Sequence, residues 1–213
     1  MIRVLLADDH DLVRTGISRM LSDIKNIETV AQASNGEEAI DLYREVKPNV
    51  VLMDIRMPGI GGLEATRKIC QIDPNAKVIA VTACMDDPFP NKLIEAGAFG
   101  YVTKSSNITE MVAAIKTVYS GKKFLSPEIA QKMALKAIEP ASVSPFSQLS
   151  HRETQVALMI VNCDKVQVIS DKLCLSTKTV NSYRYRIFEK LDITSDVELT
   201  HFAIRHEFID TVQ

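Results

Sequence analysis

The sequence predicts an α/β chain in which a doubly wound, five-stranded parallel sheet is followed by a small domain made of helices alone. Two observations support this prediction. Over residues 1–120, short apolar runs rich in β-branched residues alternate with amphipathic stretches of helix length, an order typical of a parallel sheet with helices on both faces. From residue 149 onward no strand pattern is present, and the spacing of apolar residues is helical.

Five strand–helix units make up the first part. Turn-forming pairs such as Asn35-Gly36 and Asp73-Pro74 separate them. We expect strands near residues 4–7, 29–31, 50–53, 78–81 and 100–102. We expect helices near residues 11–23, 37–46, 62–72, 88–97 and 108–119.

The segment that follows has the composition of a connection. Pro127 fits the first position of a short helix that we expect to end near residue 137. The Pro- and Ser-rich residues 139–145 have no periodicity and are typical of a linker. We therefore divide the chain into a first domain at 1–120, a helix and linker at 121–144, and a second domain at 145–210.

Four short helices are expected in the second domain, near residues 151–162, 166–173, 177–191 and 196–207. The segments that begin at Ser150 and Ser195 both read S-x-x-E. This is the pattern of a capping box, in which the serine and the glutamate side chains each accept a hydrogen bond from a free N–H group at the helix start. Short helices joined by tight turns fit a helix-turn-helix unit.

The composition limits the classes of protein to which the chain can belong. Its 213 residues include 25 Lys and Arg against 27 Asp and Glu, a net charge of −2, so any contact with nucleic acid must come from a local patch. No apolar run approaches the roughly 20 residues that cross a bilayer. The N-terminus reaches Asp8 too early for a secretory signal. We expect a cytoplasmic protein without membrane insertion.

The cysteine spacing does not indicate a metal site. Cys163 and Cys174, followed by His201 and His206, loosely resemble a zinc finger. The gap between these cysteines is far wider than the roughly two to four residues that zinc fingers use. We interpret the cysteines as buried thiols.

Polar residues stand at the ends of four expected strands. Asp8 and Asp9 follow the first strand and Asp54 the third, while Thr82 follows the fourth and Lys104 the fifth. In an open parallel sheet the carboxyl ends of the strands share one edge, where ligands bind. The sequence therefore predicts one site with three carboxylates, a hydroxyl and an ammonium group. The alternative for each aspartate alone is a strand end near a helix start, where carboxylates are favoured anyway.

Three neighbouring carboxylates repel one another and need a positive partner. Mg²⁺ is such a partner, because it takes one or two carboxylates and bridges to phosphate. An aspartate at such a site can act as a nucleophile and form an acyl phosphate, with the metal and Lys104 neutralising charge on the transferring group. His10, beside the acids, is either a base or a residue that shapes the loop.

Four segments resemble the receiver domain of bacterial two-component response regulators, which has a flavodoxin-like fold. They read LLADDH at 5–10, VLMDIRMPG at 51–59, VTA at 81–83 and YVTK at 101–104. The resemblance implies that Asp54 accepts a phosphoryl group from a histidine kinase. It also implies that Asp9, Asp54 and the backbone carbonyl of Arg56 bind Mg²⁺, with Asp8 acting directly or through water.

Three further roles follow from the same resemblance. Thr82 reaches for the phosphoryl oxygens, Tyr101 changes rotamer with it, and Lys104 pairs with the phosphate. Many receivers have proline after the lysine, where this chain has Ser105, so we expect a less rigid loop there. We expect the chain to become phosphorylated itself and to turn over no free substrate.

A Mg²⁺-dependent phosphohydrolase that forms an aspartyl phosphate is an alternative from another class. Haloacid-dehalogenase-type enzymes place a second acid two residues after the nucleophile, and this chain has Arg56 there. A second alternative is a receiver whose helical domain binds protein rather than DNA.

The expected helix at 177–191 concentrates positive charge, with four cations against Glu189 alone, a net charge of +3. At about 100° per residue its polar side chains form one stripe, and Val180, Ile187 and Leu191 face a core on the other side. Ammonium and amide groups can read purine edges, while hydroxyl and guanidinium groups hold phosphates. The alternative is an ordinary solvated helix face. The expected DNA contacts are Lys178, Thr179, Asn181, Ser182, Tyr183, Tyr185, Arg186 and Lys190.

Residues 149–206 resemble the LuxR/FixJ-type helix-turn-helix domain, with 177–191 as its recognition helix. The segments at 144–146, 176–191 and 196–200 resemble the GacA/UvrY branch of that family. This resemblance implies a membrane-bound hybrid sensor kinase as phosphodonor. It also implies a homodimer on promoter DNA, with small regulatory RNA genes as targets and RNA polymerase as a possible further partner.

Overall fold

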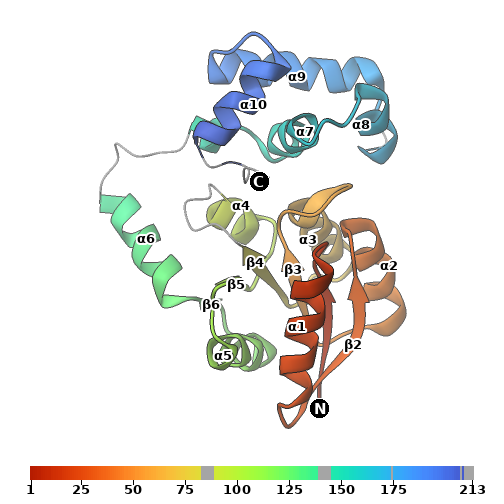
Figure 1. Ribbon diagram of the computed structural model, residues 1–213, viewed down its shortest axis with the longest axis vertical. Coiled ribbons are helices and arrows are strands. Elements are labelled where there is room, and N and C mark those ends of the chain that lie inside the picture. Colours follow the sequence, from red (N-terminus) through yellow and green to blue (C-terminus); the bar gives the residue numbers. More distant parts are fainter. Residues whose placement is uncertain (83–88, 139–144, 174, 207, 209–213) are drawn as a thin grey trace. The chain divides into compact units, whose positions relative to one another are not determined.

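The computed structural model describes residues 1–82, 89–138, 145–173, 175–206 and 208, which form two compact units (Figure 1). The first unit extends to Ile138, and the described part of the second unit begins at Pro145. Residues 139–144 of the expected linker lie outside the described residues, while Pro145 begins a 3₁₀ turn. No helix in the described ranges is long and apolar enough to cross a membrane.

The first unit is built on a parallel sheet, which confirms the predicted fold class. Its strand order is β2-β1-β3-β4-β5-β6, so the winding reverses between β1 and β3. Both faces of the central strands are buried, which explains why their sequences read as continuous apolar runs. The strands are β1 (Ile2–Ala7), β2 (Ile27–Ala33), β3 (Val50–Asp54), β4 (Val78–Thr82), β5 (Gly100–Thr103) and β6 (Phe124–Leu125).

The sequence did not predict β6, which makes the sheet six-stranded rather than five-stranded. This strand has two residues, too few for a periodic pattern. Leu125 pairs with Tyr101 of β5, and Ser126 N–H donates to the Tyr101 carbonyl at 3.0 Å. The sheet therefore reaches five residues beyond the boundary expected at residue 120.

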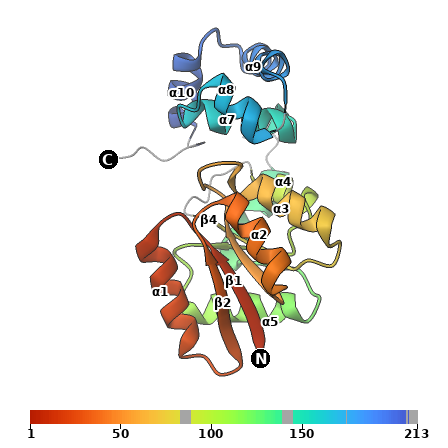
Figure 2. The same cartoon turned by 90° about the vertical axis from the view of Figure 1, so that its right-hand side faces the viewer.

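Helices cover both faces of the sheet. On one face α1 and α5 enclose the main apolar core with side chains such as Leu21 and Ile115, while α2 and α3 pack against each other on the opposite face (Figure 2). The helices of this unit are α1 (Asp11–Ser22), α2 (Gly36–Val46), α3 (Gly61–Ile72), α4 (Phe89–Glu95), α5 (Ile108–Tyr119) and α6 (Pro127–Ile138).

The second unit contains the four predicted helices around a small core. Phe146 stacks on Phe208 with ring centroids 3.8 Å apart, and Val180, Ile187 and Leu191 are buried, as their positions in the sequence predicted. The elements are a 3₁₀ turn η2 (Pro145–Gln148), α7 (His151–Val161), α8 (Val166–Leu173), α9 (Thr177–Leu191) and α10 (Asp196–Arg205).

One of the two predicted capping boxes is complete. At α7 the Ser150 and Glu153 side chains each accept from the other residue's N–H. At α10 the Ser195 side chain accepts from Glu198 N–H, but the Glu198 carboxylate accepts from Thr194 N–H at 2.6 Å instead. The second box was therefore half wrong, because the glutamate reaches one residue further back.

The expectation of buried thiols is wrong for Cys163, which is exposed at a left-handed position with φ 62°. Cys70 is half-buried, and its thiol lies 3.6 Å from the Gly97 carbonyl. Cys84 and Cys174 lie outside the described residues.

Candidate functional site

The sheet topology brings the predicted polar residues to one edge. Asp8 follows β1, Asp54 ends β3 and Thr82 ends β4, and the side chains of all three are buried. Lys104 follows β5, and its N–H donates to the Thr82 carbonyl at 2.6 Å. This edge lies at the carboxyl ends of β1 and β3, where the winding of the sheet reverses.

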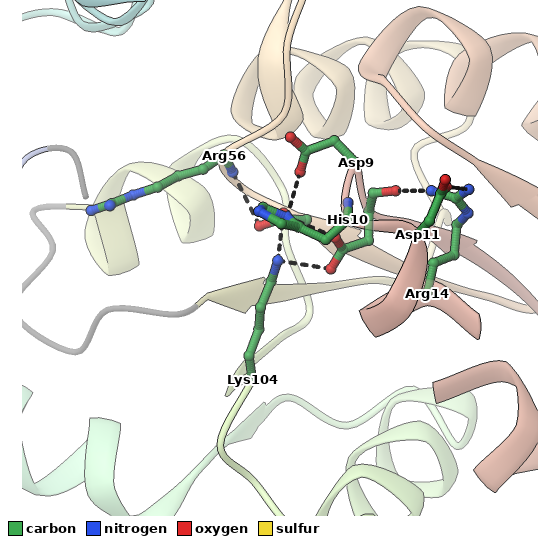
Figure 3. A network of polar contacts seen from close by, with 8 residues as sticks. Asp9, His10, Asp11, Arg14, Arg56 and Lys104 are labelled. Atoms are coloured by element: carbon green, nitrogen blue, oxygen red, sulfur yellow. Dashed lines mark hydrogen bonds and ion pairs between the residues drawn. The ribbon is translucent and has the colours of Figure 1, made fainter. Parts of the chain in front are cut away.

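One ammonium group holds two carboxylates at the centre of this edge. Lys104 Nζ lies 2.8 Å from Asp8 Oδ2 and 2.8 Å from Asp54 Oδ2 (Figure 3). Burial alone lowers the pKa of Lys104, but the two carboxylates together outweigh burial and raise it. Lys104 therefore stays charged and keeps both carboxylates close.

Asp54 is a buried carboxylate whose ionised form is disfavoured. Burial is the main cause and raises its pKa to about 6, with Asp8 adding repulsion, while Lys104 and the Arg56 N–H lower it. The Arg56 N–H donates to Asp54 Oδ1 at 3.1 Å. A second cation beside Asp54 would favour the carboxylate form, which is the nucleophilic one.

The main chain and the imidazole of His10 shape the loop after β1. Its N–H donates to Asp8 Oδ1 at 2.8 Å, and the imidazole Nδ1 lies 2.9 Å from Asp9 Oδ1 (Figure 3). Arg14 of α1 donates to the Asp8 carbonyl at 2.6 Å. These contacts support the loop-shaping role of His10, since its ring approaches the acids of its own loop.

The acidic cluster has the donor set for a metal ion. Single ligand atoms of Asp8, Asp9, His10 and Asp54 all lie within 4.8 Å of one another. Among the described residues, none donates a hydrogen bond of acceptable geometry to the buried Asp9 Oδ1. Lys104 contacts two of the three carboxylates, and the cluster offers further carboxylate oxygens to a hard divalent cation.

A second candidate site lies on α9. A hollow of about 330 Å³ is lined by polar and charged side chains along this helix. Ser176 caps the helix by accepting from Thr179 N–H at 3.0 Å, and Tyr185 is two-thirds exposed. The lining residues are Lys178, Thr179, Ser182, Tyr183 and Arg186.

Two of the four cations of α9 are engaged within their own unit. Arg184 makes a paired contact with Asp196 at 2.6 and 2.7 Å. Lys190 donates to the Glu153 carboxylate at 2.6 Å and does not line the hollow. The net charge of +3 counted on the helix therefore overstates its outward charge, which rests on Lys178 and Arg186.

Comparison with known proteins agrees with both sites. A model described as "Response regulator receiver domain" matches residues 4–116, and one described as "Bacterial regulatory proteins, luxR family" matches residues 147–203. The chain is 62% identical over 210 residues to "Response regulator GacA" of Pseudomonas protegens, covering 99% of each chain. The chain belongs to the response regulators.

This response regulator has further relatives at lower identity. It is 55% identical over 207 residues to "Response regulator UvrY" of Escherichia coli, covering 97% of this chain and 95% of UvrY. Its fold is similar to that of RcsB from Salmonella enterica serovar Typhimurium bound to promoter rprA in the presence of a phosphomimetic, with TM-score 0.74 and 21% identity. That match covers 94% of this chain and 97% of RcsB. The chain is a transcription regulator of the two-component type, not a metabolic enzyme.

The regulator also has positions that sequence reasoning did not identify. A Cβ atom on Gly62 would lie 1.8 Å from the Asp54 carbonyl oxygen, so only glycine fits at the start of α3. Glu37 of α2 contacts the loop that leads from Asp54 to α3. The glycines in the segment 59–62 could have indicated the close approach at Gly62. Nothing in the sequence near Glu37 indicated its contact with this loop.

Tyr101 lies inside the sheet rather than at its edge. It is buried on β5, pairs with Ala80 of β4, and precedes Lys104 by three residues. Asp8 and Asp54 contact Lys104 directly, while Thr82 ends β4 and Tyr101 lies on the adjacent strand β5.

Proposed function

We propose that Asp54 accepts a phosphoryl group from a histidine kinase and that the phosphorylated chain binds promoter DNA through α9 as a homodimer. The observation that supports this most directly is the buried Asp54 carboxylate at the end of β3, 2.8 Å from Lys104 Nζ. A buried carboxylate beside a fixed cation is suited to covalent transfer, because the cation offsets charge on the incoming group.

The transfer needs few groups from this chain. An Asp54 oxygen forms the bond to phosphorus, the phosphorus–nitrogen bond to the kinase histidine breaks, and a proton returns to that histidine. Lys104 pairs with the phosphoryl oxygens, and the Thr82 hydroxyl donates to one of them. Tyr101 changes rotamer with Thr82.

The acidic cluster would hold Mg²⁺ through Asp9, Asp54 and the Arg56 carbonyl, with Asp8 acting directly or through water. When bound, the cation supplies positive charge opposite the developing negative charge. The carboxylate oxygens of Asp8, Asp9 and Asp54, which lie close together, support this assignment.

On α9, Lys178 and Arg186 at the hollow would hold phosphates, and Asn181 would reach a base edge. The similarity to GacA and UvrY supports promoters of small regulatory RNAs as the targets and a membrane-bound hybrid sensor kinase as the phosphodonor.

Labelling with acetyl phosphate in Mg²⁺ tests the acceptor. Asp54→Asn should abolish labelling, because an amide cannot form the acyl phosphate. Asp41→Asn, on the exposed face of α2, is the matched control and should be labelled like the wild type. Undiminished labelling of Asp54→Asn would place the acceptor elsewhere.

Sequencing the DNA fragments bound in cells by the wild type and by Asp54→Ala tests the second half of the proposal. The wild type should be enriched at a limited set of promoters, and the variant should lose most of that enrichment. Equal enrichment by both chains would separate DNA binding from phosphorylation.

A further inference from the structure

The loop of residues 55–60 connects the acceptor strand to α3 and contains Arg56. It ends at Ile60, the N-cap residue of α3, which makes no side-chain cap. The first N–H groups of a helix have no partner within the helix and need acceptors from elsewhere. The loop supplies one acceptor itself, since Gly62 N–H donates to the Ile55 carbonyl at 3.0 Å, and Ile60 N–H donates to another element.

Glu37 of α2 supplies this acceptor. Its two carboxylate oxygens lie 3.2 and 3.4 Å from the Ile60 nitrogen, which donates to them. A Cβ atom on Gly59, where φ is +80°, would lie 2.3 Å from one of these oxygens, so the carboxylate packs directly on the loop backbone. A negative charge at a helix N-terminus is favoured as well.

The start of α2 is built to hold Glu37 in this place. A Cβ atom on Gly36 would lie 2.9 Å from the Gly61 carbonyl oxygen, so the two helix starts approach closely. The Asn35 side chain caps α2 by accepting from Glu38 N–H. The Glu38 carboxylate turns back to Ser34 N–H at 2.7 Å, which leaves the task of reaching α3 to Glu37.

We propose that Glu37 is a positioning residue for the metal site. By holding Ile60 N–H it fixes the loop of residues 55–60, and with it the direction of the Arg56 carbonyl. This inference rests on the proposed function, because it requires that Arg56 together with Asp9 and Asp54 binds the cation. Without Glu37, the loop of residues 55–60 would have to become ordered when the cation binds. The free energy needed for this ordering would lower the affinity for Mg²⁺.

The test measures Mg²⁺ affinity of the full-length chain by titration of backbone amide NMR shifts. Glu37→Ala should weaken Mg²⁺ binding about tenfold, the usual effect of losing a group that orients a metal ligand. Glu45→Ala is the matched control, since Glu45 is an exposed glutamate on the same helix. It should bind Mg²⁺ like the wild type.

A conservative variant separates positioning from a general structural role. Glu37→Gln keeps the chain length and an acceptor oxygen, so it should restore most of the lost affinity. Initial rates of labelling by acetyl phosphate should fall in Glu37→Ala at low Mg²⁺ and return to the wild-type rate at saturating Mg²⁺. Should Glu37→Ala fail to fold, Glu37→Asp takes its place, with a weaker Mg²⁺ affinity expected from its shorter side chain.

Several results would overturn the inference. Unchanged Mg²⁺ affinity in Glu37→Ala, an equal loss in Glu45→Ala, or a Glu37→Gln variant no better than Glu37→Ala would each do so. A wild type that binds no Mg²⁺ would instead overturn the proposed metal site itself, and this inference with it.

Discussion

Single residues at the carboxyl edge of the sheet hold charges that destabilise the fold. Asp54 is buried and its pKa is raised to about 6, although Lys104 Nζ lies only 2.8 Å away. Burial therefore destabilises the charged carboxylate by more than Lys104 stabilises it. Natural proteins keep such destabilising groups where a function needs them.

This imbalance predicts a pH-dependent gain in stability for Asp54→Asn without Mg²⁺. The pKa of Asp54 in the folded wild type lies above the ordinary value of 3.8. The stability that Asp54 contributes is therefore fully present below pH 3.8 and is lost as the pH rises through about 6. At pH 7.5 the variant should exceed the wild type by about 2–3 kcal/mol. The difference should shrink towards pH 4.

Urea denaturation in EDTA at several pH values measures both chains. An Asp54→Asn variant less stable than the wild type at pH 7.5 would contradict the prediction, as would a difference that does not change with pH.

Gly62 supports a second prediction at the residue scale. Gly62→Ala places a Cβ atom 1.8 Å from the Asp54 carbonyl oxygen, so backbone must move. We expect a loss of at least about 3 kcal/mol in the free energy of unfolding. Gly16→Ala is the control, because Gly16 lies inside α1 with nothing within 4 Å of the added atom. It should gain about 0.5–1 kcal/mol. Equal stabilities of the two variants would show that α3 can shift without cost.

At the scale of elements, α9 combines two kinds of cation. Arg184 and Lys190 stabilise the unit through Asp196 and Glu153, whereas Lys178 and Arg186 line the hollow. The same residue type therefore has different roles at positions 184 and 186. Mutation can separate these roles.

We expect Arg186→Ala to weaken binding to all DNA sequences alike and to reduce the slope of log affinity against log salt by about one unit. Arg184→Ala should keep that slope and lower the stability of the unit by about 1 kcal/mol, since the pair with Asp196 is partly exposed. Titrations at several salt concentrations measure the slopes. A wild-type slope in Arg186→Ala would show that this arginine touches no phosphate.

Asn181→Ala should behave differently from both arginine variants. We expect a loss of about 1–3 kcal/mol at the specific site, because an amide can pair with an adenine edge. Binding to scrambled duplex should stay nearly unchanged. Equal losses on both duplexes would argue against base reading by Asn181.

Periodicity in the sequence predicted nearly every element but few contacts between them. Ten of the elements, from β1 to α5, appear where apolar spacing indicated, because that spacing records burial of each segment. Strand β6 was missed since two residues show no period. The pairing of Lys190 with Glu153, 37 residues apart, could not be seen from local charge counting.

The candidate site was predictable for a related reason. The ends of parallel strands meet at one edge, so their positions in the sequence predicted that Asp8, Asp54 and Lys104 lie together, and the three side chains are in contact. Contacts such as that of Glu37 with Ile60 depend on how two helices pack, and sequence spacing carries no record of that.

At the scale of the whole molecule, phosphorylation acts only if it favours one conformation over another. We expect Thr82 to supply one differential contact, a hydrogen bond to a charged phosphoryl oxygen worth about 1.5–3 kcal/mol. Thr82→Ala should still be labelled by acetyl phosphate but should lose the phosphorylation-induced gain in dimerisation. Thr82→Ser keeps the hydroxyl and should retain the gain.

Sedimentation of each chain with and without acetyl phosphate measures this gain. A Thr82→Ala variant that dimerises on phosphorylation as the wild type does would exclude Thr82 from the switch.

The short strand β6 ties the segment that leaves the sheet to the backbone of Tyr101. The Tyr101 carbonyl accepts from Ser126 N–H at 3.0 Å, and Tyr101 pairs with Ala80 on its other side. The backbone of Tyr101, the residue that we propose changes rotamer on phosphorylation, therefore lies between the strand that ends in Thr82 and the segment that begins α6. We therefore expect any displacement of β5 on phosphorylation to reach the first turn of α6 through the hydrogen bond between Ser126 and Tyr101.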